Sequence, residues 1–121
     1  MSDSQVTIIG SLGRDAELRF TAGGAAICSF TVAVSHRYKK ADDWQEETAW
    51  VDVTAWSNLA ENIAASCVKG TRVICVGRLK QDTWQDKDSG KDRTKLVLVA
   101  DSVGPDLRWA TAEVARIERS Q

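Results

Sequence analysis

The chain has 121 residues, 43% of them hydrophobic, which is enough for one domain with one core. Its 16 basic and 17 acidic residues give a formal net charge of −1, which argues against binding to nucleic acid by bulk charge alone. No apolar run is long enough to span a membrane, and the polar start MSDSQVT lacks an apolar signal segment, so we expect a cytoplasmic protein.

The first half of the chain predicts strands. Residues 5–13 (QVTIIGSLG) alternate and end in glycine, which is typical of a strand that leads into a bend. Glycines 23–24 mark a turn, and residues 28–34 after it show a period of two with Cys, Phe and Val on one face. We expect a polar loop at about residues 39–48 and another alternating strand over residues 48–56 (TAWVDVTAW).

The period changes in residues 57–70 (SNLAENIAASCVKG), where apolar side chains recur every four positions. Asn58 with Glu61 is typical of a capping box at a helix start, and Gly70 of a helix stop. A helix is therefore predicted here.

Two more strands follow, in TRVICVGRLKQDTW and RTKLVLVADSVG, joined by a hairpin with Ser-Gly at its tip. The predicted fold is all-β: a five-stranded Greek-key barrel, the OB-fold, with one short helix between the third and fourth strands. Other α+β folds share this order. Gly10 and Gly77, inside two strands, fit barrel corners. For residues 105–121 (PDLRWATAEVARIERSQ), both a helical stripe and an extended arm fit the pattern.

The three cysteines, Cys28, Cys67 and Cys75, all lie in apolar segments. Their number is odd, and neither a C-x-x-C motif nor a Cys/His spacing occurs, so we expect buried thiols with no disulfide and no zinc. The single histidine, His36, has no partner at metal-ligand spacing. We expect no metal and no other cofactor.

Five tryptophans are unusual beside two phenylalanines and one tyrosine. Side chains alternate faces along a strand, so Trp50 and Trp56 lie opposite the aliphatic residues between them. Trp84 shares the phase of Arg78 and Lys80. The pattern therefore predicts three exposed indoles, at least one of them beside cations.

An exposed indole needs a cover, because burying one large apolar side chain contributes about 1.5–3 kcal/mol. An unpaired nucleobase is one such cover: stacking contributes roughly 1–3 kcal/mol per base and tolerates any base. A partner protein is the alternative, in which case the aromatics would form an interface. For Trp44 and Trp109 we favour packing or a subunit contact. No catalytic set is visible in the chain, so we do not expect an enzyme.

Several segments resemble, in order and spacing, the bacterial single-stranded DNA-binding proteins. The most specific motifs are GRxxELR, EETxW, NLAEN and KGxRV followed by GRL, and the likeness runs from about Val6 to Gly104. The resemblance implies an OB-fold, a homotetramer and sequence-tolerant binding of single-stranded DNA in replication, recombination and repair, in a cytoplasmic, nucleoid-associated protein.

The resemblance also implies which residues bind nucleic acid. Its stacking aromatics correspond to Tyr38, Trp50, Trp56 and Trp84. The matching basic positions are Arg37, Lys69 and Lys80, with Arg78 and Lys95 as weaker candidates.

The chain departs from the family pattern in two ways. Asp82 and Thr83 precede the hairpin tryptophan where relatives often carry basic residues, so DNA affinity is expected to be lower or more sensitive to salt. The sequence ends at ARIERSQ without a Gly/Pro-rich linker and acidic tip, so we expect a truncated or tailless member and assume no recruitment of replication and repair proteins through a tip. We expect residues 1–106 to form the DNA-binding domain and residues 107–121 a clamp-like extension strand in subunit contacts.

Overall fold

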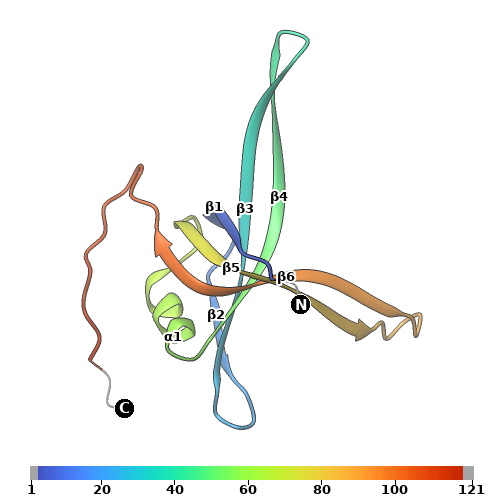
Figure 1. The fold of residues 1–121 in the computed structure, drawn as a ribbon, viewed down its shortest axis with the longest axis vertical. Helices are drawn as coiled ribbons and strands as arrows, with labels where there is room; N and C mark the ends of the chain where they lie inside the picture. The colour runs from blue at the N-terminus through green and yellow to red at the C-terminus, as the bar shows by residue number, and fades with distance from the viewer. Residues whose placement is uncertain (1–2, 119–121) are drawn as a thin grey trace.

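The computed structural model describes residues 3–118 and contains one mixed sheet and one helix (Figure 1). The elements in chain order are β1 (Val6–Leu12), β2 (Glu17–Phe20), β3 (Ala26–Lys40), β4 (Asp43–Trp56), α1 (Ser57–Ser66), β5 (Arg72–Gln85) and β6 (Asp92–Pro105). The strand order is β1-β5-β6-β4-β3-β2, and an additional pairing of β1 with β3 closes the sheet into a barrel. The predicted all-β OB-fold is confirmed.

Strand alternation directs one face of each strand except the exposed β2 into the barrel. The fully buried side chains include Phe30 and Val32 of β3, Val53 of β4, Val73 of β5 and Leu98 of β6. The helix α1 adds buried residues of its own to the same core cluster. Because only one face of each strand is needed for this core, the other face is available for a ligand.

The strand count differs from the prediction by one. Glu17–Phe20 pairs with the start of β3 as a short separate strand, with Leu18 opposite Cys28. The helix therefore lies between the fourth and fifth of six strands, instead of the third and fourth of five. All four residues of β2 are exposed, so the segment lacks the inward apolar face that identifies a strand in a sequence.

The polar loop expected at residues 39–48 is wrong. β3 and β4 stay paired down to Lys40 opposite Asp43, and only Ala41 and Asp42 form the turn. Both have positive φ, 50° and 69°, which matches the twist of a tight hairpin. The hairpin projects far from the barrel (Figure 1). No core covers its end, so neither side shows the apolar alternation of a half-buried strand, and its sequence resembles that of a loop.

The predicted capping box at Asn58 is also wrong. β4 runs directly into α1, so Trp56 is the N-cap residue, and it makes no side-chain cap hydrogen bond. The helix ends at Ser66, four residues before the predicted stop at Gly70. Gly70 instead takes a φ of +88° in the turn before β5, where its N–H donates to the carbonyl of Leu12.

At the two glycines predicted as barrel corners, the neighbouring backbone leaves no room for a side chain. A Cβ on Gly10 would overlap the carbonyl oxygen of Ala33, and one on Gly77 would overlap that of Val99. The register of β5 with β6 shifts at Val76 and Gly77, which marks an irregularity at the second glycine.

All three cysteines are free and buried, as predicted. Burial raises the pKa of each thiol, that of Cys75 to about 12. Among residues 3–118, no three or more His, Cys, Asp and Glu side chains group as a metal site. No helix in the described part of the chain is long and apolar enough to cross a membrane.

After β6, residues 106–118 form neither helix nor strand, and the chain passes outside α1 (Figure 1). The helical interpretation of this tail is wrong. The expected extension strand would pair with a neighbouring subunit; within the single chain residues 106–118 pair with no strand, so this strand stays a prediction, and residues 119–121 lie outside the described residues. An ion pair at its root, 2.7 Å between Arg72 Nε and Asp106 Oδ2, ties the tail to β5.

Candidate nucleic-acid interface

Strand register places one continuous surface on the outside of the barrel. Ser29 of β3 lies opposite Thr54 of β4, Thr54 lies beside Val99 of β6, and Val99 lies opposite Arg78 of β5. Cross-strand partners share a face, so alternation extends this row in both directions. We call this surface the outer face; besides the row, it contains Trp50, Asp52, Trp56, Lys80, Asp82, Trp84, Lys95 and Val97.

The three tryptophans of the outer face are exposed, as the sequence predicted. The exposed fraction is 64% for Trp50, 44% for Trp56 and 48% for Trp84. Val97 and Val99, on the same face, are buried and provide an apolar floor. Flat, open rings above such a floor suit a planar ligand.

Trp50 lies against Gly13, in the bend that follows β1. A Cβ on Gly13 would stand 2.7 Å from Cζ3 of the indole, and the Gly13 N–H donates to the carbonyl of Thr31 at 2.9 Å. Because Gly13 has no side chain, the Trp50 ring has room to lie on the outer face. Sequence reasoning treated Gly13 only as the end of a strand, because nothing local links it to a residue 37 positions away.

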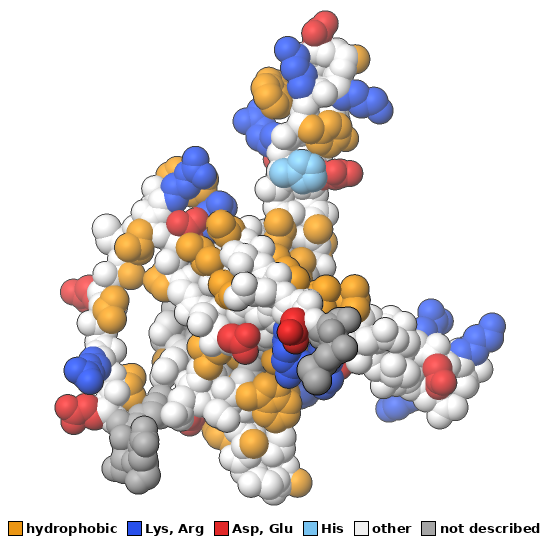
Figure 2. All heavy atoms as spheres, in the orientation of Figure 1, with side chains coloured by type: hydrophobic (Ala, Val, Ile, Leu, Met, Phe, Trp, Pro, Cys, Tyr) orange, Lys and Arg blue, Asp and Glu red, His pale blue; other side chains and the backbone are white. Residues whose placement is uncertain are grey.

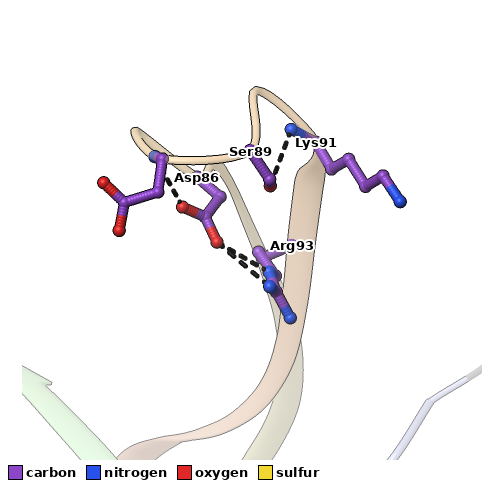
Figure 3. Close-up of polar contacts among 5 residues, drawn as sticks. Asp86, Ser89, Lys91 and Arg93 are labelled. Atoms are coloured by element: carbon purple, nitrogen blue, oxygen red, sulfur yellow. Dashed lines mark hydrogen bonds and ion pairs between the residues drawn. The ribbon is translucent and has the colours of Figure 1, made fainter.

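Trp84 stands near the end of the β5–β6 hairpin. The Lys95 ammonium lies 5.8 Å from the centroid of its ring, within range of a cation–π interaction. The turn beyond is held by its own polar contacts (Figure 3): the Asp86 carboxylate accepts from the guanidinium of Arg93 at 3.1 Å and from the N–H of Asp88 at 2.9 Å. Hydrogen bonding to Asp88, with that to Arg93, lowers the pKa of Asp86.

The cations of the outer face are partly matched by acids. Lys95 Nζ lies 3.2 Å from Asp52 Oδ2, and Lys80 Nζ lies 3.7 Å from Asp82 Oδ1. Exposed pairs of this kind contribute about 0–1 kcal/mol. A phosphate can therefore compete for either lysine at small cost.

The remaining predicted residues are Lys69, Tyr38 and Arg37. Lys69 is in the turn after α1, where its N–H donates to Asp15 at 2.8 Å. Tyr38 is exposed on β3 opposite Gln45, which places it on the other side of the β3–β4 hairpin from Trp50. Arg37, the next residue along, shares the side of Trp50. The structure therefore groups three of the four predicted aromatics and separates Tyr38 from them.

Trp44 is on the same side of β4 as Trp50 and Trp56, and it is 61% exposed. This exposure contradicts packing inside the domain, whereas a subunit contact for Trp44 stays a prediction. Its separation from Trp50 is an even number of residues, which would have revealed the shared side if the strand had been predicted to reach it. The loop expected at residues 39–48 concealed this signal.

Trp109, the tryptophan of the tail, is on none of the strands that form the outer face. The guanidinium carbons of Arg72 and Arg108 lie 4.7 Å and 4.9 Å from its ring centroid. The ring is 71% exposed, so it is not packed in the domain, and a subunit contact for Trp109 stays a prediction.

Known proteins match nearly the whole chain. The model of the single-strand binding protein family matches residues 3–106. Similar proteins named "Single-stranded DNA-binding protein" include those of Paenarthrobacter nicotinovorans, 43% identical, and Mycobacterium leprae, 41% identical. Each alignment covers 98% of this chain and 71% of the relative. The outer face thus occurs in a chain that belongs to the single-strand binding protein family.

Proposed function

We propose that this protein binds single-stranded DNA without sequence preference, and protects it during replication, recombination and repair without catalysing a reaction. The observation that carries the proposal is the outer face, where three open indoles share one sheet surface with Arg78, Lys80 and Lys95. Membership of the single-strand binding protein family supports it.

The chemistry of the outer face selects unpaired strands. Only an unpaired base exposes both of its flat surfaces, and every base has such a surface, so stacking on indole tolerates any sequence. Lysine and arginine beside the rings meet the phosphates, and this part of the affinity falls as salt rises. We assign stacking to Trp50, Trp56 and Trp84; Tyr38 stays a prediction from the resemblance.

A fluorescence titration with poly(dT) tests this function. Stacking quenches indole emission, so the emission falls on addition of DNA, and the quench weakens as salt is added. Absence of quenching at low salt would contradict the proposal. Trp84→Ala separates it from the alternative of an OB-fold interaction module: DNA binding weakens while the oligomer persists, whereas loss of an interface residue would dissociate the oligomer.

We further propose that residues 1–106 are the DNA-binding domain and that residues 107–121 take part in the subunit contacts of a homotetramer. The support is the exposed apolar character of the tail, with Leu107, Val114 and Ile117 all open to solvent in the single chain. The mass of the particle in solution tests the assembly. Deletion of residues 107–121 should lower that mass; an unchanged tetramer would place the contacts elsewhere.

A further inference from the structure

The β3–β4 hairpin extends the outer face beyond the barrel. Trp56, Trp50 and Trp44 follow one another at intervals of six residues on one side of β4. A strand rises about 3.3 Å per residue, so neighbouring rings are about 20 Å apart along the strand. The three form a row about 40 Å long, and Trp44 is its outermost member.

The two sides of the hairpin end differ in charge. Register places Arg37 opposite Glu46 and Lys39 opposite Trp44 on one side, which leaves that side with a positive excess. The other side holds Tyr38 and Lys40 with the two acids Asp43 and Glu47, and Glu47 pairs with His36 at 3.3 Å. Hydrophobic side chains and Lys and Arg side chains gather together over this end of the molecule (Figure 2). A polyanion is favoured on the side of Trp44.

The immediate surroundings of Trp44 fit a stacked base. The guanidinium carbon of Arg37 lies 5.3 Å from the centroid of its ring, so a cation stands over the indole while 61% of the residue stays exposed. Base, indole and guanidinium are all planar and can stack together. Arg37 also brings a positive charge to within reach of the adjoining phosphate.

We propose that Trp44, with Arg37 stacked on it, is an additional base-stacking subsite that binds one unpaired nucleobase of a strand already bound at Trp50 and Trp56. This inference rests on the proposed function. It assigns Trp44 a contact that only a long DNA strand makes, because all the bases of a short oligonucleotide can be bound by the rings nearer the barrel.

The test compares three variants, Trp44→Ala, Tyr38→Ala and Trp109→Ala, with the unmodified chain. Each is titrated by emission with poly(dT) and with an oligothymidylate of about 6 nucleotides, within the range of one OB-fold site. Trp109→Ala is the matched control, since this ring is also exposed and also has arginine over it. Tyr38→Ala controls for the other side of the hairpin.

We expect Trp44→Ala to bind poly(dT) about tenfold more weakly, to lose absolute quench amplitude, and to bind the short oligomer unchanged. Trp44→Phe should restore most of the affinity. Trp109→Ala should leave affinity unchanged and raise the fractional quench, because it removes emission that DNA does not quench. Tyr38→Ala should have a smaller effect than Trp44→Ala.

Equal poly(dT) affinity of Trp44→Ala and the unmodified chain would overturn the inference while leaving the proposed function intact. A change in particle mass without a change in DNA binding would also overturn it and assign Trp44 to a subunit contact. Failure of the unmodified chain to bind either DNA would sink the proposed function itself. Because Trp44 is exposed at the end of a hairpin, its replacement should not unfold the barrel, and a thermal melt checks this.

Discussion

The outer face and the tail both expose tryptophan beside cations, yet they differ in what holds the ring. Trp109, 71% exposed, has the guanidinium groups of Arg72 and Arg108 near its ring and lies on a segment with no regular structure. Trp50, Trp56 and Trp84 stand on paired strands whose other side is locked into the core. An exposed indole therefore suggests a binding site only where a rigid, paired strand presents it.

The largest effect is expected from breaking the outer face itself. Removing two rings in Trp50→Ala/Trp84→Ala should cost about 2–6 kcal/mol of DNA binding, since each stacked base contributes roughly 1–3 kcal/mol. The melting temperature should change little, because neither side chain belongs to the core. Affinity from a titration at fixed salt measures the loss. Trp109→Ala serves as the control. Equal losses of DNA affinity in this variant and in the double variant would contradict the distinction between the tail and the outer face.

A second prediction concerns the support of Trp50. In Gly13→Ala, the new methyl group would meet the indole 2.7 Å away and displace it, so poly(dT) binding should weaken by up to about tenfold. Gly104→Ala is the matched control, since nothing lies within 4 Å of a Cβ there. If both variants bind poly(dT) equally well, the contact between Gly13 and the Trp50 ring does not matter for DNA binding.

Charge on the outer face gives a smaller effect. Asp52→Asn removes the partner of Lys95 while keeping an oxygen to accept from Thr31, so the lysine becomes available to phosphate. We expect DNA binding to tighten by a few-fold and its salt dependence to steepen, with stability changed by less than about 1 kcal/mol. Asp43→Asn, on the other side of the hairpin, should do less. Weaker binding of Asp52→Asn would mean that the carboxylate positions Lys95.

The smallest effect concerns the tail. The hydrogen bond from Arg72 is the main cause that holds the pKa of Asp106 below its usual value, so the pair stabilises the tail above about pH 4. This contribution is lost as the pH falls through the lowered pKa, because protonation removes the charge that Arg72 meets. Emission of a protein with Trp109 as its single tryptophan should follow the loss. If the same pH transition in emission occurs in Asp106→Asn, it belongs to another titrating group.

Much of the barrel was predictable because burial imposes a period. Residues such as Phe30, Val53 and Val73 alternate with polar neighbours, and Gly10 and Gly77 interrupt strands where a side chain cannot fit. The same alternation predicted the exposure of Trp50, Trp56 and Trp84 correctly. Prediction failed where no core constrains the chain: in β2 and at the end of the β3–β4 hairpin.

The sequence by itself determined which side of each strand turns inward, because the hydrophobic effect acts on every second residue of a half-buried strand. It predicted the β5–β6 hairpin, but it could not determine pairings between strands that are far apart in the chain, such as β4 with β6. Only the tertiary structure showed that Asp52 pairs with Lys95 and that Trp50 lies against Gly13. It also placed Trp44 on the same side of the β3–β4 hairpin as Trp50, and Tyr38 on the opposite side. The single-stranded DNA that we propose as the ligand would bind to this surface, which no single segment of the chain can form alone.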